Sequence, residues 1–195
     1  MPLVLMFVVA LAAGLAGGYV RGGRLEALLG LRLAATVLVP LAVGLQLAAG
    51  TAPPSLRPLL IVVSYCVGGT WLALNARGRG GRVGAGLALL AAGWLLNLVP
   101  IVANGAMPVS SPALRATGAS KRFRPEQGHL WKHRAAGTRT AMPWLGDVMP
   151  LSRVRTVISV GDVLLLLGVA ATTAGAMTAA PGDDRVGGVV SAAAG

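Results

Sequence analysis

The stretch VGAGLALLAAGWLLNLVPIVANGAMPVS, Val83 to Ser110, decides the fold. Its apolar part runs from Val83 to Ala103 and ends on the polar pair Asn104-Gly105. A helix needs about 20 apolar residues to cross the roughly 30 Å of bilayer hydrocarbon. Since every backbone amide in lipid must be paired within its own segment, we predict a transmembrane helix here.

The composition of the whole chain agrees with a membrane protein. Of its 195 residues, 55% are hydrophobic and only 12% are charged, whereas about a quarter of the residues of a soluble domain are charged. These figures exclude a soluble enzyme with a large charged surface. Cys66 is the only cysteine, so neither an intrachain disulfide nor a cysteine-based zinc site is possible.

Four further apolar runs are long enough to be spans. They are Pro2–Val20, Leu33–Ala49, Leu59–Ala76 and Val160–Ala180. We therefore predict an all-α integral membrane protein with about five transmembrane helices in a domain over residues 1–180, and a disordered tail over 181–195. No basic residue precedes the first run, so we expect it to be a helix rather than a cleaved signal peptide.

Small residues recur every four positions on the first predicted helix, at Ala10, Gly14, Gly18 and Gly22. Such a row lets another helix backbone approach closely. We expect it to pack inside one subunit, and a homodimer contact is the alternative.

The basic residues of the short loops set the expected orientation. Arginines gather in the first loop (Arg21, Arg24, Arg32) and in the third (Arg77, Arg79, Arg82). Because short basic loops tend to stay in the cytoplasm, we predict an outside N-terminus and an inside C-terminus. The loop between the fourth and fifth helices would then lie outside, although its own basic residues favour the inside. The alternative is that this loop lies inside and faces anionic lipid of the inner leaflet.

That fourth loop, residues 105–156, is long and strongly basic. It holds nine lysines and arginines against Glu126 and Asp147, a net charge of +7. Within it, Thr140–Ser152 is apolar but too short to span a bilayer. We expect this segment to lie in the membrane interface or to dip back toward the helices, anchored by Trp144. We expect Asp147 to pair with an arginine of the loop.

Polar residues mark the junction between the helices and this loop. Asn97 and Asn104 are seven residues apart, so they share one helix face. We expect Asn97 to tie helices together and Asn104-Gly105 to end its helix with a left-handed cap. The alternative is a polar notch at the membrane edge. The sequence SVGD, Ser159 to Asp162, has the spacing of a capping box that opens the last helix.

Two other kinds of site are weakly indicated in the loop. Glu126, His129 and His133 would share a helix face and could hold a divalent metal, but the neighbouring Lys132 and Arg134 would repel a cation. We therefore predict neither a metal nor a cofactor. Aromatic residues among the basic ones could bind nucleic acid, yet beside a membrane they more often mark the interface.

Several motifs together resemble a known family. They are ANGAMPVS at Ala103 to Ser110, His129, the Thr138-Arg139-Thr140 triplet, PWLGDVMPL at Pro143 to Leu151, and SVGD. They resemble the bacterial membrane family called domain of unknown function 5317. The resemblance implies a small multi-pass protein of the bacterial cytoplasmic membrane, and it implies no catalytic residue. It suggests that these motifs form one site.

From these motifs we predict a site for a ligand or partner. Its candidate residues are Asn97, Asn104, Gly105, Met107, Pro108, His129, Arg139, Pro143, Trp144, Asp147 and Asp162. We expect a non-enzymatic accessory or binding protein whose basic loop contacts anionic membrane lipid, a partner membrane protein or a second copy, and no nucleic acid.

Two other functions stay open. The first is an interfacial enzyme acting on a lipid head group, with Glu126, His129, His133 and Asp147 as bases or metal ligands. The second is a small transporter component with Asn97, Asn104 and Gln46 lining a path, although intramembrane charges that could relay ions are nearly absent.

Overall fold

The computed structural model describes residues 2–118 and 132–179. Its helices are α1 (Pro2–Val20), α2 (Leu25–Leu29), α3 (Leu38–Thr51), α4 (Arg57–Ala76), α5 (Gly81–Asn104), α6 (Ser111–Ala116) and α7 (Val160–Met177). The strands are β1 (Met107–Val109), β2 (His133–Ala135), β3 (Met149–Leu151) and β4 (Thr156–Ile158), and the 3₁₀ turns are η3 (Pro143–Leu145) and η4 (Ser152–Val154). The described fold is thus mostly helical, with all its strands between α5 and α7.

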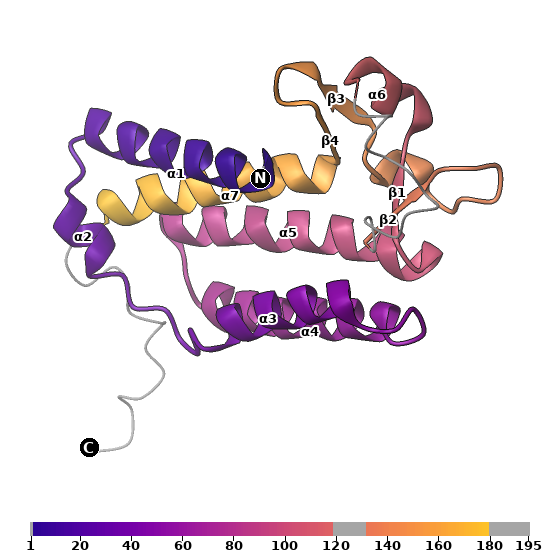
Figure 1. Ribbon diagram of the computed structural model, residues 1–195. Coiled ribbons are helices and arrows are strands. Elements are labelled where there is room, and N and C mark those ends of the chain that lie inside the picture. Colours follow the sequence, from indigo (N-terminus) through magenta and orange to yellow (C-terminus); the bar gives the residue numbers. More distant parts are fainter. Residues whose placement is uncertain (1, 119–131, 180–195) are drawn as a thin grey trace.

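The long helices form a layered bundle in which α7 lies between α1 and α5, α4 packs against α5, and α3 packs against α4 (Figure 1). Glycines make the close approaches possible. A Cβ atom on Gly168 of α7 would lie 2.7 Å from the backbone nitrogen of Leu90 in α5. A Cβ atom on Gly14 of α1 would lie 2.7 Å from the backbone oxygen of Ala170 in α7. The glycine row of α1 therefore packs inside the subunit, as predicted, although Gly22 instead adopts a turn with φ +75°.

Among the described residues, three helices are long and apolar enough to cross a membrane, namely α4, α5 and α7. Two shorter apolar helices accompany them, Val4–Val20 and Leu38–Thr51. The second predicted run was expected to start at Leu33, but α3 starts at Leu38, because Asn75 holds Ala34 and Ala35 has a left-handed φ of +49°. With 14 residues, α3 is about 21 Å long at 1.5 Å per residue, less than the hydrocarbon thickness.

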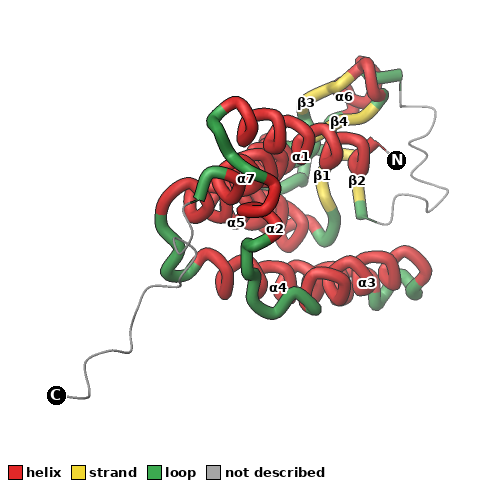
Figure 2. The backbone as a smooth tube through the Cα atoms, turned by 90° about the vertical axis from the view of Figure 1, so that its left-hand side faces the viewer, coloured by secondary structure: helices red, strands yellow, loops and turns green. Residues whose placement is uncertain are grey.

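The bundle has two different ends, visible in both views (Figures 1 and 2). At one end lie the connection between α1 and α3 and the turn between α4 and α5, where the amide of Arg24 donates to the oxygen of Met177 at 2.9 Å. We call this the far end. At the other end lie the start of α1, the start of α4 and the chain between α5 and α7. We call that chain, residues 105–118 and 132–159, the cap.

The cap corrects the expectation of an all-α fold. In it β1 pairs with β2 in parallel, and β3 pairs with β4 antiparallel. Pro108 and Pro150 occupy the middle positions of β1 and β3. Because proline has no backbone N–H, a helix through either position would lose a hydrogen bond. The other backbone groups then pair between extended segments, because buried amides and carbonyls need partners.

A hydrophobic cluster fixes the cap to the bundle. Ala49, Ile61, Tyr65, Ile101 and Met107 are all buried in it, and they come from α3, α4, α5 and β1. Since Met107 belongs to the first strand of the cap, the cap shares a core with the helices. The cap is therefore an integral part of the bundle end rather than a separate loop.

Candidate functional site

The junction of α5, α7 and the cap is built on three hydrogen-bonded side chains, Asn97, Ser159 and Asp162, which we call the junction triad. Asn97 is 4% exposed. Its Nδ2 donates to Oδ1 of Asp162 at 2.8 Å, and its Oδ1 accepts from Oγ of Ser159 at 2.7 Å. The triad ties α5 to α7, which confirms the structural interpretation of Asn97.

The start of α7 has the predicted capping box. The backbone nitrogen of Asp162 donates to Oγ of Ser159 at 3.0 Å, and the backbone nitrogen of Ser159 donates to Oδ2 of Asp162 at 3.1 Å. The carboxylate of Asp162 thus caps α7 with one oxygen and binds Asn97 with the other. An anion is also favoured there by the positive end of the helix dipole.

Asn104 and Gly105 end α5 as expected. Gly105 is left-handed, with φ 71° and ψ −2°. The side chain of Asn104 donates to the oxygens of Pro100 at 2.8 Å and Ala141 at 2.9 Å, and it accepts from the amide of Ala141 at 2.9 Å. Asn104 therefore holds the chain before η3 against the end of α5.

Strand β1 is the centre of the cap. On one edge it pairs with β2, and on the other the amide of Asp147 donates to the oxygen of Pro108 at 2.8 Å. The amide of Ser110 donates in turn to the oxygen of Asp147 at 2.9 Å. A Cβ atom on Gly146 would overlap the oxygen of Pro108, so this close approach requires glycine. The ANGAMPVS and PWLGD motifs are therefore in direct contact.

Beside β1 lie three ionisable side chains, Lys132, His133 and Asp147, which we call the ionisable cluster. Asp147 is 6% exposed, and its Oδ2 lies 3.4 Å from Nε2 of His133. Nζ of Lys132 donates to Oε1 of Gln46 at 3.0 Å and lies 5.6 Å from the ring centre of Tyr65. The prediction that Asp147 pairs with an arginine of the loop is wrong. Strand β2 places His133 opposite Met107 of β1, and Asp147 bonds to the other edge of β1, so the two side chains lie beside the same strand.

Burial shifts the titration of the whole ionisable cluster. It raises the pKa of the Asp147 carboxyl well above its usual range, and the negative charge of Asp162 adds to this. It lowers the pKa of the His133 imidazole to about 4, and Lys132 adds to that shift. Burial also lowers the pKa of the Lys132 ammonium, against the attraction of both aspartates. His133 is consequently neutral near pH 7, so its contact with Asp147 is not a pairing of two full charges.

The remaining predicted site residues fall into two groups. Met107 and Pro108 are buried in β1, whereas Arg139 lies in an exposed turn and Pro143 and Trp144 are exposed on η3. The structure thus joins Asn97 to Asp162 and β1 to Asp147, and it leaves Arg139, Pro143 and Trp144 on the surface.

The metal hypothesis depends on residues beyond the described ranges. Glu126 and His129 lie outside the described residues, as does the predicted tail over 181–195. Within residues 2–118 and 132–179, no group of three histidine, cysteine, aspartate or glutamate side chains could hold a metal ion.

Sequence reasoning missed an aromatic pair, Tyr65 and Trp94, of which Tyr65 lies below Lys132 of the ionisable cluster. The rings of Tyr65 and Trp94 lie 4.6 Å apart between centroids, and Nε1 of Trp94 donates to the oxygen of Tyr65 at 2.8 Å. Their positions inside two apolar runs gave one usable signal, since buried tyrosine and tryptophan need a polar partner. Nothing in the spacing pointed to Lys132 as the cation above the Tyr65 ring.

The sequence model of one family, described as a family of unknown function (DUF5317), matches residues 28–173. The chain belongs to the DUF5317 family. No curated protein and no solved structure matches it. The DUF5317 match takes in α3, the junction triad, the ionisable cluster and most of α7, whereas α1 precedes it.

Proposed function

We propose that this DUF5317 protein is a non-enzymatic multi-pass protein of the bacterial cytoplasmic membrane, and that its cap binds the head groups of anionic phospholipids. In this proposal all five long helices are embedded in the bilayer. The N-terminus and the cap face outward, and the far end faces the cytoplasm. The observation that carries the proposal is the set of unpaired arginines on the surface of the cap.

The outer faces of the helices support embedding in lipid. Large apolar side chains are exposed on the long helices, including Val8 of α1, Leu47 of α3, Leu59 of α4 and Leu95 of α5. Exposed apolar surface of this extent is unfavourable in water. In a bilayer the same surface contacts lipid chains at no such cost, and α4, α5 and α7 have the length to cross it.

The cap surface supports binding of anions. Five of its described arginines are exposed, namely Arg115, Arg134, Arg139, Arg153 and Arg155. The one ion pair that the structure shows within the described residues is His133 with Asp147, so these guanidinium groups are available to a ligand. Guanidinium groups bind phosphate oxygens through two parallel hydrogen bonds.

The position of the cap supports a lipid rather than a soluble anion. The cap begins directly after the last residue of α5 and ends directly before the first residue of α7. Its arginines therefore lie near the level of the head groups if those helices span the membrane. Trp144 is 66% exposed on the cap, and tryptophan is typical of the membrane interface.

Lipid retention tests the proposal. The protein would be placed in nanodiscs of equal phosphatidylglycerol and phosphatidylcholine, extracted in mild detergent, and analysed by native mass spectrometry. We expect the bound lipid to be enriched in phosphatidylglycerol, and the enrichment to be lost when the five exposed cap arginines are replaced by glutamine.

A matched control carries the same change of charge at the far end. Five exposed arginines there would be replaced by glutamine, namely Arg21, Arg24, Arg32, Arg77 and Arg82. We expect this variant to keep most of the enrichment. An equal loss in the two variants would reduce the effect to net charge and would overturn the assignment to the cap.

A further inference from the structure

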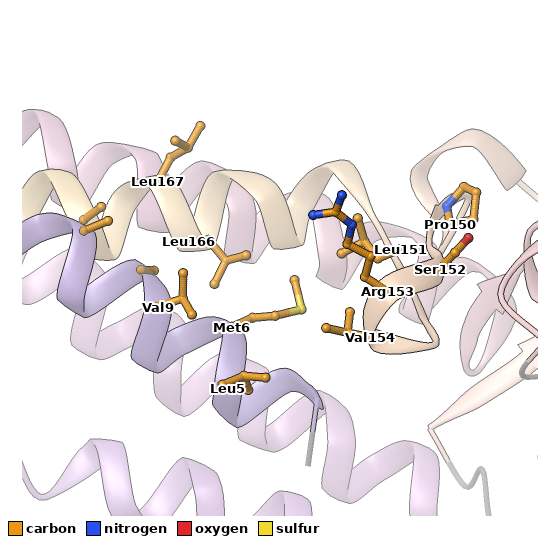
Figure 3. A pocket seen from close by; sticks show the side chains of 13 residues that line it. Leu5, Met6, Val9, Pro150, Leu151, Ser152, Arg153, Val154, Leu166 and Leu167 are labelled. Atoms are coloured by element: carbon orange, nitrogen blue, oxygen red, sulfur yellow. The ribbon is translucent and has the colours of Figure 1, made fainter.

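An apolar groove runs along the outside of the bundle between α1 and α7 and ends at the cap (Figure 3). Its volume is about 590 Å³, within the range of about 300–1,000 Å³ that is usual for small-molecule sites. Leu5, Met6 and Val9 form the α1 wall, and Leu166 and Leu167 form the α7 wall. Residues 150–154, from β3 and η4, close the cap end.

The groove has the depth of one leaflet of a bilayer. Of the α7 residues that line the groove, Ala170 lies farthest from the cap, ten residues after the helix start at Val160. Ten residues of helix rise about 15 Å, and half of the bilayer hydrocarbon is also about 15 Å thick. A chain lying in the groove would therefore extend from head-group level at η4 to about the middle of the membrane.

The charge of the groove lies at one end only. Arg153 is the one charged residue of the lining, and it belongs to η4 at the cap end. In Figure 3 its guanidinium group extends from η4 toward α7. Arg153 forms no ion pair with any acidic side chain of residues 2–118 or 132–179. A site with apolar walls and one cation at its mouth matches a molecule with a hydrocarbon chain and an anionic head.

We propose that the groove binds one acyl chain of an anionic phospholipid, with the phosphate on the guanidinium group of Arg153. This inference rests on the proposed function, since it names the place where one of the bound lipids sits. It differs from general attraction to the cap, because it requires a single chain between α1 and α7.

Photo-crosslinking tests the location. A phosphatidylglycerol with a diazirine in one acyl chain would be added at trace level to phosphatidylcholine nanodiscs containing the full chain. After irradiation, mass spectrometry of peptides would locate the adducts. We expect them on the groove-lining parts of α1 and α7.

Arg153→Gln should reduce this labelling by about tenfold, the effect of losing one charge-assisted hydrogen bond. Arg77→Gln is the matched control, because it removes an exposed arginine at the far end, outside the cap, that does not line the groove. We expect it to leave the labelling unchanged. Equal losses in the two variants would overturn the role of Arg153.

A second pair of variants tests the walls without touching the charge. Ala13 is exposed and lines the groove, whereas Ala16 is exposed on the same helix and does not line it. Ala13→Trp should fill the groove and remove the adducts, and Ala16→Trp should preserve them. Both variants would be compared in thermal unfolding, so that loss of labelling is read only from folded protein.

The outcomes separate this inference from the proposed function. Retained phosphatidylglycerol enrichment with adducts scattered over all helices would overturn the groove site and leave the proposed function standing. Equal labelling by a diazirine phosphatidylcholine would overturn the anionic preference of the groove. Absence of adducts from α1 and α7 in folded protein would likewise overturn the groove site.

Discussion

The two ends of the bundle use the same residue type in different ways. At the far end Asn75 is 1% exposed, and its side chain bonds only to backbone groups, those of Ala34 at 2.8 and 3.1 Å and of Trp71 at 2.9 Å. At the cap end Asn97 is 4% exposed, and it bonds to two side chains, the carboxylate of Asp162 and the hydroxyl of Ser159.

Asn75 fixes a connection between helices, whereas Asn97 holds together a group of side chains at the candidate site. A neutral amide on backbone groups is sufficient to fix the chain around Ala34 against α4. The cap end also buries Asp147 and half-buries Lys132 and His133, although taking ionisable groups out of water is costly unless they are paired. The far end also holds a half-buried ionisable side chain, Arg79, but its guanidinium group donates to the backbone oxygen of Arg32. The cap end differs because it gathers an amine, an imidazole and a carboxyl group beside one strand.

The largest expected effect is on the packing that brings the junction triad together. Gly161→Ala would place a Cβ atom on the side-chain oxygen of Asn97, so α5 and α7 must separate or the triad must break. We expect a loss of about 1–3 kcal/mol in the free energy of unfolding, typical of overpacking. Thermal unfolding in detergent would measure it.

Gly44→Ala is the control for this change, because a Cβ atom on Gly44 of α3 would meet nothing within 4 Å. Alanine is the better helix former by about 1 kcal/mol, so this variant should be no less stable than the parent. If Gly161→Ala is equally harmless, the contact between Asn97 and the start of α7 is looser than the structure shows.

A smaller effect should distinguish the two asparagines. Asn97→Leu leaves the carboxylate of Asp162 and the hydroxyl of Ser159 each without one partner, which should cost about 1–2 kcal/mol of global stability. Asn75→Leu should act locally, since its main partner, Ala34, lies in a connection rather than a helix. Hydrogen exchange would show faster exchange around Ala34 for Asn75→Leu, and faster exchange at both α5 and α7 for Asn97→Leu. Identical exchange maps would contradict the difference between the local role of Asn75 and the role of Asn97 in joining two helices.

The sequence predicted the features that depend on neighbouring residues. The end of α5 follows from Asn104-Gly105 and the start of α7 from the SVGD capping box, and each of these rules acts within a few positions. Apolar length alone predicted the other boundaries less exactly, since α7 ends at Met177 rather than at Ala180 and α4 starts at Arg57 rather than at Leu59.

The features that the sequence did not reveal depend on distant residues. The pairing of Lys132 with Gln46 joins positions 86 apart, and no spacing rule connects them. The cap strands are three residues each, too short for the alternation that identifies a strand. His133 becomes the partner of Asp147 through the pairing of β1 with β2. Because that pairing was not predicted, an arginine was expected where the fold supplies a histidine.

The smallest expected effect concerns pH and should be confined to the cap end. The pKa of His133 falls from 6.5 in the unfolded chain to about 4 in the fold, so His133 adds stability above pH 6.5 and loses it as the pH falls toward 4. Asp147 acts in the opposite direction, because its raised pKa adds stability at low pH that is lost as the pH rises through the folded value. His133→Gln removes the first contribution only.

We therefore expect the melting temperature of the parent, taken relative to that of His133→Gln, to fall steadily from pH 6.5 to pH 4. The side chain of His133 is 32% exposed, so solvent screening should limit the change to below about 1 kcal/mol. Asn75→Leu, whose surroundings at the far end hold no group of the ionisable cluster, should keep a constant difference from the parent over the same range. A constant difference for His133→Gln as well would mean that His133 titrates as it does in water, and that the two ends of the bundle do not differ in their response to pH.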